Sequence, residues 1–246
     1  MSIVKILPIN IKEASGICRS ILHPGIYYVN NDSGNKTILY AINENAQVVA
    51  ELRFSTGAAD AEDCSSALVN GVPTLILCDV GDNDCKRKGH TIFVIEEPSI
   101  LETQVVTPKK IIFSYPDNKC RNCEACSLNT DGTISVITKS FPPVSGPATR
   151  FEIKSWLSGN TETVVSPGIV LNRKYGTVTG MDNYQGTDLI LGIQSGNATG
   201  YIVSEPPKNV KIQKTLQNEG ICFSHDKTKI ITVSERDRKM IFTPIK

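Results

Sequence analysis

The chain has 246 residues, of which 40% are hydrophobic and 21% are charged. This balance excludes a disordered chain and allows one large domain or two small ones. The formal net charge of +1 argues against binding to nucleic acid through a basic excess, and no apolar run approaches the roughly 20 residues of a membrane span. We therefore expect neither nucleic acid nor a membrane among its partners.

The N-terminal residues predict where the protein resides. Residues 1–8 contain no basic stretch followed by a long apolar segment, so we expect no signal peptide and a cytoplasmic location. Secretion is the alternative, because Asn35 and Asn197 each begin an Asn-x-Thr glycosylation sequence. In the cytoplasm the eight cysteines would be mostly reduced and would serve as small core residues.

Short runs rich in Val, Ile, Thr, Tyr and Phe follow one another along the chain, separated by Gly, Pro, Asn and Asp. This pattern is typical of strands joined by turns. The strands recur in five sets, and each set begins with a similar short phrase, at residues 13–18, 60–65, 122–127, 177–182 and 217–222. Second strands are expected at residues 26–30, 74–80, 134–138, 189–193 and 230–233, and third strands at 38–42, 92–95, 149–153, 201–203 and 240–243.

The spacing of the five phrases predicts the fold. Their third residues are 40 to 62 residues apart, which is the size of a four-stranded propeller blade; these residues are Ser15, Glu62, Glu124, Thr179 and Glu219. Fourth strands are expected at residues 48–54, 109–115, 164–171 and 210–216, and residues 3–8 can supply the fourth strand that the last set lacks. A two-sheet sandwich is the alternative, but it does not explain the repeated phrase.

We therefore predict an all-β protein, a single five-bladed β-propeller with four strands per blade. The N-terminal strand closes the last blade, which also removes exposed sheet edges. The predicted blades comprise residues 13–54, 60–116, 122–172, 177–216, and 217–246 together with 2–9.

Several motifs resemble those of known propellers. They are Glu-Ala-Ser-Gly-Ile at 13–17, Asn-Asp-Ser-Gly at 31–34, Ala-Glu-Asp at 61–63, Asp-Val-Gly-Asp-Asn at 79–83 with Lys-Arg at 86–87, Glu-Glu-Pro at 96–98, Tyr-Pro-Asp at 115–117 and Asn-Cys-Glu-Ala at 122–125. Together they resemble a poorly characterised propeller family near the phytase-like and esterase-like propellers. The Ser-Gly-Ile and Glu-Gly-Ile repeats also resemble a group of small five-bladed propellers related to a quorum-sensing-regulated bacterial protein. The resemblance to phytase-like propellers implies a hydrolase.

In a propeller, the starts of the inner strands and the loops between second and third strands lie on one face. We expect these segments to bring several acidic side chains together around the channel. Like-charged carboxylates in such a place repel one another unless they are protonated or bind a cation, and hard oxygen donors suit Ca²⁺. The expected ligands are Glu62, Glu124, Glu219, Asp82, Asn83 and Glu235. Alternatively, each ring glutamate accepts hydrogen bonds from backbone N–H groups of the next blade.

Other polar residues on the same face are candidates for catalysis or binding. Glu13 and Asp60 could act as the general base, and His90 as a general acid or base. The candidates for ligand contacts are Asn31, Asp32, Lys139, Gln194 and Arg236. A zinc or iron–sulfur site at Cys120, Cys123 and Cys126 is a further alternative, because the first two have C-x₂-C spacing.

These residues predict a metal-dependent hydrolase of a small ester, lactone or phosphoester. The alternative is a non-catalytic binding module for a glycan, another small molecule or a protein partner, which the lack of any G-x-S-x-G, P-loop or HExxH motif favours. A structural component is a third reading that no particular residue supports.

Overall fold

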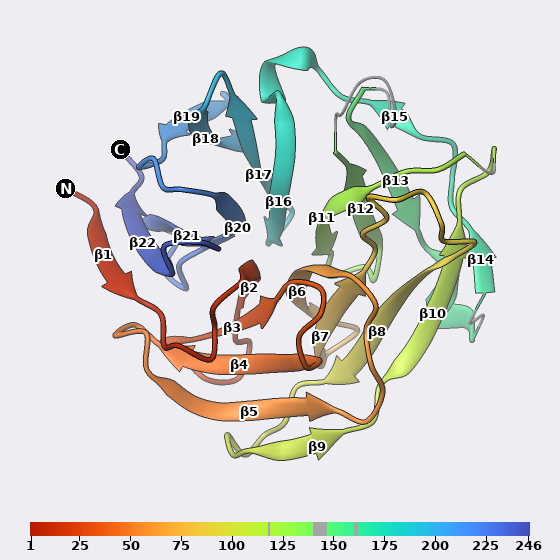
Figure 1. Ribbon diagram of the computed structural model, residues 1–246, viewed down its shortest axis with the longest axis horizontal. Coiled ribbons are helices and arrows are strands. Elements are labelled where there is room, and N and C mark those ends of the chain that lie inside the picture. Colours follow the sequence, from red (N-terminus) through yellow and green to blue (C-terminus); the bar gives the residue numbers. More distant parts are fainter. Residues whose placement is uncertain (118, 140–146, 160–161) are drawn as a thin grey trace.

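The computed structural model describes residues 1–117, 119–139, 147–159 and 162–246. Its strands form five sheets arranged around a central axis like the blades of a propeller (Figure 1), so the predicted fold is confirmed. Within the described residues the helical elements are two 3-10 turns, η1 (Ser155–Ser158) and η2 (Arg173–Tyr175). No helix in this part of the chain is long and apolar enough to cross a membrane.

The first two blades each contain four antiparallel strands and one added parallel strand. Blade 1 comprises β2 (Ala14–Arg19), β3 (Ile26–Asn31), β4 (Ile38–Asn43), β5 (Val48–Phe54) and β9 (Gln104–Val106). Blade 2 comprises β6 (Ala61–Val69), β7 (Val72–Asp79), β8 (His90–Glu96), β10 (Lys109–Ser114) and β14 (Glu162–Val164).

The remaining three blades have four antiparallel strands each. Blade 3 comprises β11 (Cys123–Leu128), β12 (Ile134–Thr138), β13 (Thr149–Ile153) and β15 (Ile169–Val170). Blade 4 comprises β16 (Thr177–Tyr184), β17 (Thr187–Gln194), β18 (Asn197–Val203) and β19 (Lys208–Lys211). Blade 5 comprises β20 (Asn218–Phe223), β21 (Lys229–Ser234), β22 (Lys239–Pro244) and β1 (Ile3–Ile6).

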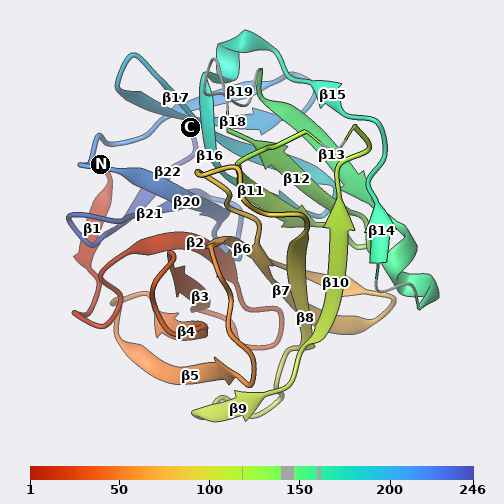
Figure 2. The same cartoon turned by 45° about the vertical axis from the view of Figure 1, so that its right-hand side comes forward.

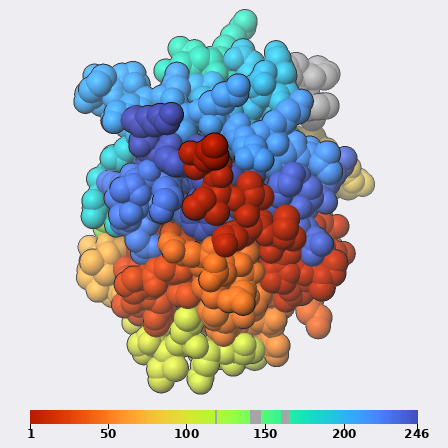
Figure 3. Space-filling view, turned by 90° about the vertical axis from the view of Figure 1, so that its left-hand side faces the viewer, coloured from red at the N-terminus to blue at the C-terminus, as the bar shows by residue number. Residues whose placement is uncertain are grey.

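The two ends of the chain close the ring together. Strand β1 pairs antiparallel with β22, with Ile3 opposite Phe242 and Ile6 opposite Lys239. Figure 3 shows the red N-terminal segment lying against blue C-terminal residues. The predicted closure by the N-terminal strand is therefore confirmed.

The outer edges of the blades differ from the prediction. The segment expected as one strand at 164–171 is two, and β14 pairs in parallel with β10 of the preceding blade. Likewise β9, which precedes β10 in the chain, pairs in parallel with β5; Figure 2 shows both added strands at the periphery. The outer strand of blade 4 is Lys208–Lys211, not 210–216.

Each inner strand has an irregularity where it meets its second strand. The pairing register shifts between Ala14 and Ile17, Ala61 and Asp63, Cys123 and Ala125, Val178 and Gly180, and Asn218 and Ile221. Such bulges insert residues and re-aim side chains. In all five blades the shift spans the third residue of the repeated phrase, so the phrase marks a structural requirement of the ring.

The inner strands pack closely around the axis. Strands β2, β11 and β20 are buried along their whole length, whereas the outer strand β5 alternates between buried and exposed residues. A Cβ atom on Gly220 would lie 2.6 Å from the carbonyl oxygen of Ser15 and 2.8 Å from the backbone nitrogen of Ile17. Glycine is required at this position because neighbouring inner strands approach so closely.

Buried polar side chains connect different blades across the channel. Asp63 of β6 accepts hydrogen bonds from the backbone nitrogens of Cys126 in β11, at 2.9 Å, and Met181 in β16, at 3.3 Å. At the end of β2, the Arg19 guanidinium lies 2.7 Å from the Asp182 carboxylate of β16. These contacts connect the inner strands of blades 1, 2, 3 and 4 around the axis.

Four of the eight cysteines form disulfides, Cys78–Cys126 and Cys85–Cys120. The expectation of mostly reduced cysteines is therefore wrong for these four, because the fold brings cysteines from neighbouring segments together. The other four are buried and free, namely Cys18, Cys64, Cys123 and Cys222. Two of the three cysteines considered for a zinc or iron–sulfur site are thus bonded to other partners.

Candidate functional site

We call the end of the channel where the five inner strands begin the mouth. Each blade contributes its bulge residue there, and the five are only 4–7% exposed: Ser15, Glu62, Glu124, Thr179 and Glu219. Three carboxylates, from blades 2, 3 and 5, therefore occupy equivalent positions around one axis. The prediction that the repeated phrases gather acidic side chains at one face agrees with this arrangement.

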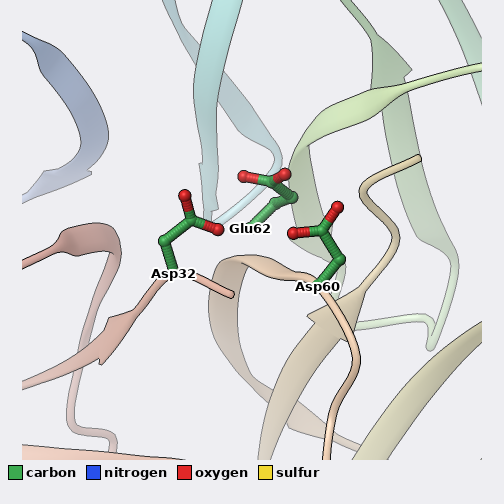
Figure 4. Close-up of side chains that lie close together, drawn as sticks. All are labelled: Asp32, Asp60 and Glu62. Atoms are coloured by element: carbon green, nitrogen blue, oxygen red, sulfur yellow. The ribbon is translucent and has the colours of Figure 1, made fainter. Parts of the chain in front are cut away.

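A compact group of carboxylates occupies one side of the mouth. Asp32 follows β3, Asp60 precedes β6 and Glu62 lies in β6. One oxygen from each lies within 4.8 Å of the others, and Figure 4 shows the three carboxylates pointing toward one another. Three convergent oxygen donors from two blades form an arrangement that a hard cation can bridge.

Burial and mutual repulsion change the acidity of this group. The pKa of Glu62 is raised well above its usual value by burial first and then by the charge of Glu124. Burial and the neighbouring Asp32 raise the pKa of Asp60 to about 6, and burial raises that of Asp32. Without a cation, protons therefore compensate part of the charge.

Glu62 is the buried member of the group, whereas Asp32 and Asp60 are half-buried. It is 4% exposed, yet among the residues that the structure describes its carboxylate has no hydrogen-bond or ion-pair partner. Its burial and the neighbouring carboxylates disfavour the ionised form. Its surroundings therefore favour either a proton or a positive ligand.

A close backbone approach fixes the position of these carboxylates. A Cβ atom on Gly81 would lie 2.3 Å from an oxygen of Asp60 and 2.3 Å from an oxygen of Glu62. The segment carrying Gly81 is held in turn by Asp79, whose carboxylate accepts hydrogen bonds from the backbone nitrogen of Asp60 and from Arg87, both at 2.8 Å. Asp79 thus helps to position the cluster.

The next ring carboxylate lies in an ion pair. The Lys139 ammonium is 2.9 Å from Glu124, and the side chain of Asn122 also donates to the same carboxylate oxygen. Burial still raises the pKa of Glu124, and Lys139 opposes this increase. Lys139 therefore brings a positive charge to the Glu124 side of the mouth.

The third ring carboxylate has a different environment. Glu219 accepts a hydrogen bond from the side chain of Gln217 at 2.6 Å. Burial, followed by the charge of Glu124, raises its pKa to about 7. The charge of Glu235 also raises the pKa of Glu219, and the pKa of Glu235 is itself raised by burial and by Asp32. Glu219 is thus close to the midpoint between its two protonation states at neutral pH.

Two residues expected to bind metal have structural contacts in the loop after β7. The Asp82 carboxylate accepts a hydrogen bond from the backbone nitrogen of Lys86 at 2.8 Å, and its own backbone nitrogen donates to Asn122 at 2.7 Å. Asn83 is exposed and accepts a hydrogen bond from Asn122 at 3.0 Å. Both residues border the Glu124 side of the mouth, apart from the three-carboxylate group.

The remaining candidates are spread around and beyond the rim. Glu13 is half-exposed and accepts a hydrogen bond from Asn35. Asn31 links backbone groups of Glu13 and Asn10. Both Gln194, the last residue of β17, and Arg236, in the loop after β21, are exposed.

His90 begins β8 and is 4% exposed. Its ring lies 5.4 Å from Phe113 and 5.3 Å from Tyr115. Burial and the charge of Arg87 lower its pKa to about 4, so the ring is neutral at physiological pH. The structure thus places it in an aromatic cluster and not beside the carboxylates.

The alternative role for the ring glutamates, acceptance of backbone hydrogen bonds from the next blade, is performed by another residue. Asp63, which directly follows Glu62, accepts from backbone nitrogens of blades 3 and 4. The sequence analysis did not single out Asp63 or Asn122. The acidic pair Glu62-Asp63 in the repeated phrase was the available signal, because one residue at a bulge can face the mouth while the next faces the interior.

Comparison with known proteins identifies the fold. No protein-family model and no curated protein sequence matches the chain. Among solved structures, a gluconolactonase from Xanthomonas campestris is 9% identical, with a TM-score of 0.51 over 94% of this chain and 72% of that chain. A virginiamycin B lyase from Staphylococcus aureus is 12% identical, with a TM-score of 0.52 over 100% of this chain and 99% of that chain.

A streptogramin B lyase is also similar, with 9% identity and a TM-score of 0.50 over 98% of this chain and 97% of that chain. At such low identity these similarities concern the fold alone. None of the three is described as a phytase-like or esterase-like propeller, so that finer resemblance stays a prediction.

Proposed function

We propose that the mouth binds one divalent cation, preferably Ca²⁺, through Asp32, Asp60 and Glu62, and that the protein hydrolyses a small ester or lactone there. The observation that carries this proposal is the convergence of the three carboxylates within 4.8 Å. The burial of Glu62 supports it, because a cation would offset the cost of ionising this carboxylate there. Bound Ca²⁺ would supply a Lewis acid for the carbonyl oxygen of the substrate.

The chain provides different environments for binding and for proton transfer. Asp32, Asp60 and Glu62 offer only oxygen donors, the chemistry that Ca²⁺ and Mg²⁺ prefer over zinc. Glu219 lies outside this group, in a ring position of equal depth, and its pKa of about 7 suits a general base that takes a proton from water. We assign that role to Glu219 in preference to Glu13, which lies at the half-exposed rim.

Lys139 can orient the substrate. Its ammonium lies at Glu124, where it can donate a hydrogen bond to a substrate oxygen while Glu124 keeps it in place. Because the carboxylates of Glu124, Glu219 and Glu62 all act on this half-buried ammonium, an uncharged ester or lactone would enter more readily than a phosphoester. The name of the similar gluconolactonase structure is compatible with this substrate class, although the similarity itself concerns only the fold.

The experiment is an assay of ester and lactone hydrolysis with Ca²⁺, with Mg²⁺ and with a chelator, corrected for spontaneous hydrolysis. The proposal expects activity that the chelator abolishes and Ca²⁺ restores. Glu62→Gln should lose metal dependence together with activity, whereas the matched control Glu102→Gln, at an exposed position outside the mouth, should keep both.

A non-catalytic binding module is the second candidate. It is favoured by the burial of His90 among aromatic rings, which leaves carboxylates as the acid–base groups of the mouth. Cation binding without turnover of any ester or lactone would support this candidate. Glu219→Gln would then change ligand affinity alone.

A further inference from the structure

The two disulfides lie in very different environments. Cys78 and Cys126 are both 0% exposed and belong to the hydrophobic core between blades 2 and 3. Cys85 is exposed and Cys120 is half-buried. A reductant in solution therefore reaches the second disulfide without unfolding of the core, and exposed disulfides are the ones that are typically labile.

The accessible disulfide joins the two segments that meet at Asn122. Cys85 lies in the loop between β7 and β8, and Cys120 lies just ahead of β11. Two residues before Cys85, Asn83 accepts a hydrogen bond from the Asn122 side chain, at 3.0 Å. The Asn122 side chain also donates to Glu124. The loop that carries the disulfide is therefore connected, through Asn122, to the ring carboxylate Glu124.

Besides the disulfide, the loop is held by Asp82, whose backbone nitrogen donates to Asn122 and whose carboxylate accepts from the backbone nitrogens of Lys86 and Arg87. Residues 83–86 are exposed, so their polar contacts compete with water. Cys85 itself has a φ of 55°, in the left-handed region that disfavours residues with a side chain. The covalent bond to Cys120 holds it there, together with the hydrogen bond from its backbone nitrogen to the carbonyl oxygen of Asp82 at 3.2 Å.

We propose that Cys85–Cys120 is a redox-sensitive clamp that holds the β7–β8 loop against Asn122 and thereby orders the Glu124 side of the mouth. Its effect on cation binding rests on the proposed function. In the switching step a dithiol reductant breaks the Cys85–Cys120 bond. The two protein sulfurs gain two electrons and two protons, and the two reductant sulfurs are oxidised to a disulfide.

The first measurement establishes which disulfide opens. The native protein is treated with dithiothreitol, alkylated, and digested for mass spectrometry. The clamp predicts that Cys85 and Cys120 are labelled while Cys78 and Cys126 stay protected. Labelling of all four at the same rate would contradict the proposed selectivity.

The second measurement follows the loop itself by amide hydrogen exchange and does not depend on any ligand. Reduction should speed exchange at residues 80–89 and 120–124 at least tenfold, with the other blades unchanged. The double variant Cys85→Ser/Cys120→Ser should exchange like the reduced protein and should not respond to dithiothreitol. Unchanged exchange after confirmed reduction would overturn the clamp.

Calcium titration then connects the clamp to the mouth. If reduction leaves the binding-competent arrangement populated about one-tenth of the time, the apparent Kd rises about tenfold and returns on reoxidation. Equal affinity before and after reduction would refute control of the site by the clamp. Failure of the oxidised protein to bind Ca²⁺ would refute the proposed function, and hydrogen exchange would still decide the clamp.

Discussion

Replacing Glu219 with Gln should stabilise the cation-free protein at high pH. The carboxyl is 7% exposed and its pKa is raised from 4.5 to about 7 by burial and by Glu124. Between these values the folded protein binds more protons than the unfolded chain, so this group lowers stability as pH rises. The full difference corresponds to about 3 kcal/mol once both forms are ionised. Glutamine keeps an acceptor oxygen for Gln217.

The assay is urea denaturation at pH 5 and pH 8 in the presence of a chelator. The variant should exceed the wild type by about 3 kcal/mol at pH 8 and by less than about 1 kcal/mol at pH 5. At roughly 2–4 °C per kcal/mol for a domain of this size, Tm should rise by about 6–12 °C at pH 8. Glu102→Gln, at an exposed position, serves as the control. Equal differences at both pH values, or a less stable variant at pH 8, would refute the reasoning.

Three further substitutions test other parts of the structure. Gly81→Ala places a Cβ atom 2.3 Å from two carboxylate oxygens. Calorimetry should therefore show at least about a tenfold loss of Ca²⁺ affinity, with an unchanged circular dichroism spectrum. Unchanged affinity would show that the carboxylates can move without losing the cation, against the reasoning here. Arg19→Ala removes the ion-pair partner of the buried Asp182 and should lower the free energy of unfolding in urea by about 3–5 kcal/mol. Lys154→Ala, in an exposed ion pair, should lower it by less than about 1 kcal/mol. Similar losses in both variants would contradict the argument from burial. Cys85→Ser/Cys120→Ser opens a 35-residue separation and should cost up to about 4 kcal/mol by loop entropy; stabilisation would indicate a strained link.

The blades could be predicted because the repeated phrase has a structural cause. Each phrase contains the bulge at which an inner strand shifts register, so its residue types are restricted in all five blades. The outer strands have no such restriction, and they pair with whichever edge is near. For that reason the parallel strands β9 and β14, which add to a neighbouring blade, could not be read from the chain.

The carboxylates of the mouth could also be predicted, but their grouping could not. Asp32 comes from a loop of blade 1 and meets Asp60 and Glu62 of blade 2, a contact that depends on the angle between blades. We expected His90 to act as a general acid or base on the face of the mouth, yet aromatic side chains from β10 and the segment after it surround it. Local sequence reports which residues share a face and does not report distances across the ring.

The most direct test is a calorimetric titration of the oxidised protein with Ca²⁺ at pH 8, which is above the pKa of about 6 for Asp60 and of about 7 for Glu219. The proposed site predicts one ion per chain for the wild type, retained binding in Glu102→Gln, and at least about a tenfold weaker Kd in Glu62→Gln. A wild type that binds no Ca²⁺, or a Glu62→Gln variant that binds it as tightly as the wild type, would contradict a cation site at Asp32, Asp60 and Glu62.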